Sequence, residues 1–204
     1  MIKMKKNILL TLVLFSITTG YSQHKSKVST FYNKEIYIFA EPLREYEILK
    51  GTNSSTQWTS GLTRGLVNPS IKDRVVGFIQ KLTTEYAKKG ETFDAVLYTG
   101  GKEIKAIRFT GPPTQENFRT AFVREVNNIP FFVLSKPVGD YQVVSKVSNG
   151  LKLKSFATLG FVNNSIEQDL KSFTNKVKRK FKKGKIEALI YIDKKKAHSI
   201  KFKH

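Results

Sequence analysis

The sequence predicts an α+β fold built from two tandem β-β-β-α-β-β repeats, each a mainly antiparallel sheet with one helix packed on it. Three observations predict this fold. Shifting the chain against itself by 95 residues aligns IYIFAEPLREYEIL, from Ile36, with FFVLSKPVGDYQVV, from Phe131, without a gap. The same shift aligns GLVNPSI with GFVNNSI. Apolar residues then recur at steps of three and four in both copies. A self-match at one fixed offset is typical of an internal repeat.

Each repeat is expected to begin with a hairpin. The runs Val28–Phe31 and Val123–Val126 lead into Tyr32-Asn33 and Asn127-Asn128. Asparagine tolerates the positive φ that tight hairpin turns require. The strand after each turn is continuously apolar, as expected for a strand that is buried on both faces.

A proline is found near the end of the second predicted strand of each repeat. Pro42 and Pro137 are expected to end it, because proline cannot donate to a sheet ladder. Tyr46 and Tyr141 are expected to begin the third strand.

One amphipathic helix is expected in each repeat, over Ile71–Lys88 and Ile166–Lys183. The spacing of the apolar residues describes one stripe of a helix. The stripe consists of Val75, Phe78, Leu82 and Tyr86 in the first copy and Leu170, Phe173, Val177 and Phe181 in the second. Helix caps are expected at 68–70 and 163–165, with Gly90 and Gly184 at or just past the helix ends.

A second hairpin closes each repeat. It joins DAVLY to AIRF in the first copy and EALIY to SIKF in the second. The predicted organisation is a signal peptide over 1–22, a first repeat over 27–109, a linker over 110–121 and a second repeat over 122–204. The alignment leaves open whether the repeats pack face to face or continue one sheet.

The N-terminal segment is typical of an export signal. Lys3, Lys5 and Lys6 precede the apolar run Ile8–Ile17, and the small residues Gly20 and Ser22 suit cleavage after position 22. The apolar run is about half of the roughly 20 residues that span a bilayer. We therefore expect a periplasmic or secreted protein with no transmembrane segment in the mature chain. The absence of cysteine excludes disulfides and thiolate chemistry.

Positive charge is concentrated in the second part of the chain. Residues 24–145 carry 17 basic and 12 acidic side chains, whereas residues 146–204 carry 16 basic and 4 acidic ones. The positive electrostatic field of such a segment attracts polyanions. The candidate polyanion-binding residues lie on and just after the second helix: Lys171, Lys176, Lys178, Arg179, Lys180, Lys182, Lys183 and Lys185.

Catalytic and metal-binding patterns are not found in the sequence. The three histidines, His24, His198 and His204, lack the spacing of a metal or triad motif. Among the acids, Glu45 and Asp94 have acidic counterparts in the second copy and are the candidates for hydrolysis. We expect no catalytic residue, no metal and no cofactor.

The order of elements and the strand-Pro-x-x-x-Tyr pattern, at Pro42/Tyr46 and Pro137/Tyr141, resemble exported bacterial envelope proteins built from duplicated small α+β modules. The resemblance implies no catalytic residues.

The sequence therefore favours an exported, non-enzymatic binding or structural module. Its basic second repeat is expected to contact an anionic glycan or lipopolysaccharide surface, or extracellular nucleic acid. The alternative is a secreted hydrolase that uses Glu45 or Asp94. A third interpretation is membrane perturbation by the basic helix, although the apolar stripe shared by both copies argues that this stripe faces a core. The oligomeric state stays open.

Overall fold

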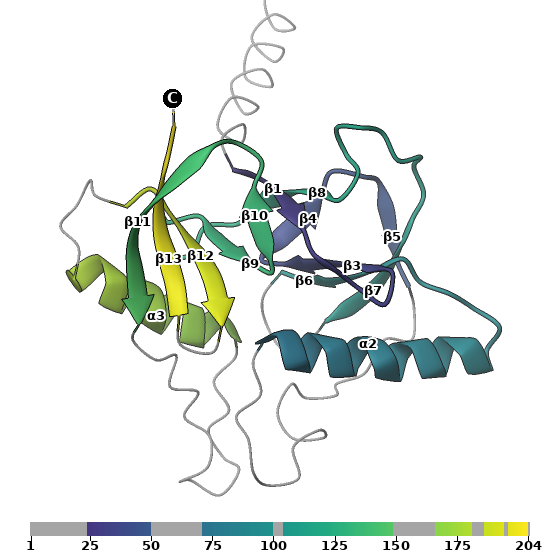
Figure 1. Cartoon of the computed structure of the whole chain (residues 1–204). Coiled ribbons are helices and arrows are strands. Elements are labelled where there is room, and N and C mark those ends of the chain that lie inside the picture. Colours follow the sequence, from purple (N-terminus) through teal and green to yellow (C-terminus); the bar gives the residue numbers. More distant parts are fainter. Residues whose placement is uncertain are drawn as a thin grey trace, which may run out of the picture.

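The structure, a computed structural model, describes residues 24–49, 71–99, 104–148, 166–180, 186–193 and 196–203. These residues form a mixed α+β fold that consists mostly of strands, with a four-stranded sheet, a nine-stranded sheet and two helices (Figure 1). We refer to residues 24–109 as the first half and to residues 120–203 as the second half.

The described residues of the first half form seven strands and one helix. They are β1 (Lys25–Val28), β2 (Thr30–Phe31), β3 (Lys34–Ile38), β4 (Ala40–Pro42), β5 (Tyr46–Ile48), α2 (Ile71–Lys88), β6 (Ala95–Tyr98) and β7 (Lys105–Phe109). The second half contains β8 (Thr120–Val123), β9 (Phe131–Val133), β10 (Ser135–Pro137), β11 (Tyr141–Ser148), α3 (Ile166–Lys180), β12 (Ala188–Asp193) and β13 (Lys196–Phe202).

Both sheets draw strands from both halves. The large sheet has the order β11-β13-β12-β9-β3-β6-β7-β5, with β2 paired to β3, and the two halves meet where Ile38 pairs with Val133. The small sheet has the order β10-β1-β8-β4. Strand pairs are antiparallel except β3 with β6 and β9 with β12. The halves therefore continue one large sheet.

The fold has three layers (Figure 1). Helices α2 and α3 cover one face of the large sheet, and their buried side chains share one core with Phe131, Val133 and Leu189. The small sheet covers the other face. There Val28 and Ala121 pack in a second core, and Val123 packs in a third core against strands of the second half.

Several local predictions are confirmed. The hairpin turns have positive φ at Tyr32 and Asn33 (51° and 59°) and at Asn127 and Asn128 (53° and 57°). Helix α2 has the predicted bounds, and Gly90 follows it with φ of 67°. Glycine adopts this conformation without the cost that a Cβ atom imposes.

The predicted second strand is broken, which corrects the expectation that it runs on to the proline. Phe39 and Leu134 have φ of 51° and 52°, and the chain turns there from the large sheet into the small one. Pro42 and Pro137 thus end β4 and β10, separate strands of the small sheet. Bulky residues rarely adopt positive φ, so the sequence carries no local signal for this corner.

The expectation of one sheet per repeat is also wrong. β1 pairs with β8 and β10, and β4 pairs with β8, so strands of the two halves alternate in the small sheet. The physical reason is that short strands need partners for their backbone groups, and each half supplies them to the other. β8 begins at Thr120, inside the predicted linker 110–121.

Candidate anionic-polymer interface

Helix α3 buries its apolar stripe against the large sheet. Phe173 and Val177 are buried, and the ring of Phe173 meets that of Phe131 edge to face at 6.0 Å between centroids. Residues four apart lie on the same face of a helix. This part of the stripe therefore faces the protein core, as the duplicated pattern predicts.

Four of the eight predicted polyanion-binding side chains are described, and all four are exposed. They are Lys171, Lys176, Lys178 and Arg179. The Lys180 side chain and residues Lys182, Lys183 and Lys185 lie outside the described residues. With 3.6 residues per turn, the four exposed residues fall outside the buried stripe. Lys171 and Lys178 share one flank, Lys176 lies on the other, and Arg179 lies on the side of the helix opposite the stripe.

The first flank is attached to the Asn127-Asn128 turn. Lys178 Nζ donates a hydrogen bond to the Asn127 carbonyl oxygen. The Asn127 side-chain amide donates to the Lys171 carbonyl oxygen at 3.1 Å and to Asn175 Oδ1 at 3.0 Å. Lys178 therefore has a docking role that its charge alone does not indicate.

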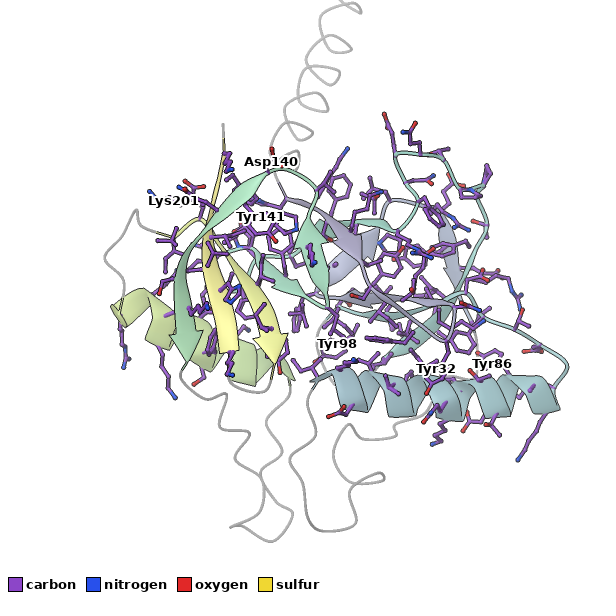
Figure 2. The ribbon with its side chains drawn as sticks, viewed as in Figure 1. Tyr32, Tyr86, Tyr98, Asp140, Tyr141 and Lys201 are labelled. Carbon is purple, nitrogen blue, oxygen red and sulfur yellow. The ribbon has the colours of Figure 1, made fainter. Side chains whose placement is uncertain are left out.

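Helix α2 has an equivalent contact with its own hairpin. Gln80 Nε2 lies 2.8 Å from the hydroxyl oxygen of Tyr32, in the turn beside α2 (Figure 2). Gln80 and Tyr32 precede Asn175 and Asn127 by 95 residues each. Both helices are thus attached to a turn at corresponding positions, which leaves Lys176 on the flank away from the turn.

Further basic residues, which were not among the sequence-based candidates, lie on the last strands of the second half. Lys146 of β11 lies opposite His198, Gln142 lies opposite Lys201, and Ser148 lies opposite Lys196. Figure 2 shows Lys201 near Tyr141, at the start of β11. The charge excess over residues 146–204 was the available signal, but it did not reveal that these side chains share a sheet.

The acidic candidates take part in structural contacts. Asp94 Oδ2 accepts a hydrogen bond from the Phe109 backbone N–H at 2.9 Å, and Glu187 Oε2 accepts one from Phe202 at 2.8 Å. Glu45 is exposed, and its carbonyl oxygen accepts the Thr110 N–H at 3.0 Å. Both hydrolase candidates therefore lie near the end of β7, where the Asp94 carboxylate holds the backbone.

The neighbouring acids form ion pairs. Glu41 pairs with Arg124, and Glu47 Oε1 lies 3.3 Å from Arg108 Nη1. The Glu47 pair joins β5 to β7, and the Glu41 pair joins β4 to the residue that follows β8.

The described histidines are apart from one another. His24 Nε2 lies 3.6 Å from Glu125 Oε1, whereas His198 lies on β13 between β11 and β12. Within the described part of the chain, no three histidine, aspartate or glutamate side chains gather as metal ligands would.

A buried polar cluster in the first half was missed by the sequence analysis. The Tyr37 hydroxyl donates a hydrogen bond to Glu35 Oε2, and Arg44 Nη1 lies 3.9 Å from Glu35 Oε1. The Arg44 guanidinium stacks on the Phe109 ring, 3.7 Å from its centroid. Burial raises the pKa of Tyr37 well above its ordinary value, and the hydrogen bond to Glu35 adds to this effect.

No helix in the described parts of the chain is both long and apolar enough to cross a membrane. No protein-family model matches the chain, and no significant similarity links it to a curated protein or to a solved structure.

Proposed function

We propose that this chain is an exported, non-enzymatic binding module whose second half contacts an anionic polymer of the cell envelope or its surroundings. The contact surface is the basic face of α3. The observation that carries this proposal is that Lys171, Lys176, Lys178 and Arg179 are all exposed on a helix whose apolar stripe is already buried.

We also propose that the two halves are tandem copies of one module. The corner residues Phe39 and Leu134 are 95 residues apart, as are the strands β4 and β10. If each strand of the large sheet is replaced by the corresponding strand of the other half, the strand order is simply reversed. At the centre of the sheet, Ile38 pairs with Val133, its own counterpart. These agreements support a duplication that places α2 and α3 in equivalent positions.

Comparison of the two helices supports a specific role for the charge of α3. At the same offset, Lys171, Lys178 and Arg179 correspond to Val76, Thr83 and Thr84. Helix α2 packs on the sheet without charges at the positions of Lys171 and Arg179, so packing does not require these two cations, whereas Lys178 also attaches α3 to the turn. A cluster of cations that packing does not need is best explained by an anionic partner.

The chemistry of the surface favours a sulfated or phosphorylated glycan over single-stranded nucleic acid. Lysine engages sulfate and phosphate groups as a mobile point charge. Single-stranded nucleic acids also need exposed aromatic rings on which bases stack. The described side chains of α3 include one aromatic ring, that of Phe173, and it is buried.

The test is retention on immobilised heparin, lipopolysaccharide and single-stranded DNA across a salt gradient. The variant Lys176→Gln/Arg179→Gln/Lys180→Gln removes three charges from α3. The matched control Lys81→Gln/Lys88→Gln/Lys89→Gln also removes three charges, two from α2 and one from the residue that follows it. We expect the α3 variant to elute from heparin and lipopolysaccharide at clearly lower salt than the control, because each lost ionic contact reduces counterion release.

Two outcomes would contradict the proposal. Equal elution of the two variants would mean that net charge, not α3, governs retention. Tighter binding of DNA than of either glycan matrix would replace the proposed ligand class. The single variant Lys178→Gln separates docking from binding, since we expect it to lower thermal stability more than it lowers retention.

A further inference from the structure

The small sheet exists only where the two halves meet. Its three strand pairs are β10 with β1, β1 with β8, and β8 with β4. Each pair joins a strand of one half to a strand of the other, so in the described residues no small-sheet strand has a neighbour from its own half. Ala121, which is fully buried, lies opposite both Ser26 and Pro42 of the first half.

The corners that lead into the small sheet are also held by the opposite half. The Phe39 carbonyl oxygen accepts the Arg124 backbone N–H at 2.7 Å, and the Leu134 carbonyl oxygen accepts the Ser29 N–H at 2.9 Å. A bulky residue keeps positive φ only when its surroundings enforce it. Each half therefore supplies a hydrogen bond that fixes the strained corner of the other.

The apolar cores likewise combine side chains of both halves. The core beneath the small sheet combines Ala121 with Val28 and Tyr37 of the first half. The core beneath the helices contains both Phe78 of α2 and Phe173 of α3. Separating the halves would expose these side chains to water, at a cost that rises with the apolar area exposed.

The linker between the halves, by contrast, is stabilised mainly by its own residues. Positions 112–116 are exposed. The Thr114 N–H donates to Asn117 Oδ1 at 2.6 Å, and the Asn117 N–H donates to Thr114 Oγ1 at 3.2 Å. This self-contained turn contributes no strand to either sheet.

We infer that the two halves are obligate partners held together by exchanged strands, and that the peptide link between them is dispensable once they have assembled. The chain acts as a fused two-part complex, in which the linker raises the effective concentration of one half around the other. Neither half keeps its fold without its partner.

The experiment cuts the full chain at a specific protease site inserted between Pro113 and Thr114. We expect the cut protein to elute as one species at the volume of the intact protein. Its unfolding midpoint should rise with protein concentration, whereas that of the intact chain should not, because cutting makes assembly bimolecular. On dilution, separation of the halves and loss of circular dichroism should coincide.

Engineered disulfides test the strand exchange itself, and the chain has no cysteine of its own to interfere. Lys27 and Lys136 lie directly opposite each other across the halves, so oxidised Lys27→Cys/Lys136→Cys should abolish the concentration dependence of the cut protein. Glu47 and Arg108 lie directly opposite each other within the first half. Oxidised Glu47→Cys/Arg108→Cys should leave the dependence unchanged.

Three results would overturn the inference. They are halves that separate while each keeps its circular dichroism, a midpoint of the cut protein that is independent of concentration, or a disulfide that forms in the control pair only. The reduced form of each variant serves to establish that it folds.

Discussion

At the residue scale, the first half differs from the second in its buried polar cluster. Glu35 accepts a hydrogen bond from Tyr37 and forms an ion pair with Arg44. At positions 95 residues later the second half has Pro130, Phe132 and Gly139. None of these three residues has a polar side chain, which indicates that the polar cluster is specific to the first half.

The buried hydroxyl of Tyr37 makes stability sensitive to high pH. Its folded-state pKa is raised above the ordinary value of 10.0, so the unfolded chain loses this proton first as pH rises. The native state then holds more protons than the unfolded state, and the free energy of unfolding falls. Above pH 10, we expect this residue to contribute a loss of about 1.4 kcal/mol per pH unit.

The variant Tyr37→Phe tests this contribution by urea denaturation between pH 7 and pH 11. Phe132 occupies the equivalent position, so the ring is expected to fit. We expect a loss of about 1 to 2 kcal/mol at neutral pH, because Glu35 loses a donor, and a shallower decline above pH 10. Tyr32→Phe, at a residue that is 60% exposed, is the control. An unchanged alkaline slope in Tyr37→Phe would contradict the prediction.

At the element scale, α2 and α3 differ in the charge of their exposed faces but are attached to the sheet and to a hairpin turn in the same way. Each has a buried stripe and one contact with a hairpin turn. Most of the stability of such helices comes from packing of the apolar face rather than from helix propensity. Truncating the stripe should therefore cost much more than changing the exposed face.

The variant Phe173→Ala makes this prediction measurable. The side chain is 2% exposed and packs on Phe131, so its loss should leave a cavity and cost about 3 to 4 kcal/mol in urea denaturation. The control is Ser172→Ala, at an exposed position of the same helix. A loss below about 1 kcal/mol would mean that α3 is not anchored by this contact.

At the scale of the whole molecule, the shared sheets couple the halves. A strand of either half cannot leave the small sheet without freeing a strand of the other. Regions that open together in hydrogen exchange share one free energy of opening. The molecule is therefore expected to unfold as one unit.

Amide hydrogen exchange in Phe173→Ala tests that coupling. The substitution lies in the second half, yet we expect amides of β6 and β12 to lose the same amount of protection, equal to the loss of global stability. Protection that falls in β12 but persists in β6 would show that the halves unfold separately.

Much of the local structure could be predicted from the sequence. The 95-residue offset located the hairpin turns and both helices, and an offset of 93 residues located the final hairpins, because turn chemistry and helical periodicity act over a few residues. The basic character of α3 was also readable, since charge is a property of composition. Docking by Lys178 was not, because its partner Asn127 lies 51 residues away.

The sequence by itself determined the positions of the hairpin turns and helices, the apolar stripes and the uneven charge. Tertiary structure alone decided the corners at Phe39 and Leu134, the exchange of strands in the small sheet, and the burial of Glu35 and Tyr37 beside Arg44. The physical reason is the distance along the chain over which each interaction acts. Periodicity and turn preferences depend on neighbouring residues, whereas strand partners and buried polar contacts depend on groups that only the assembled fold brings together.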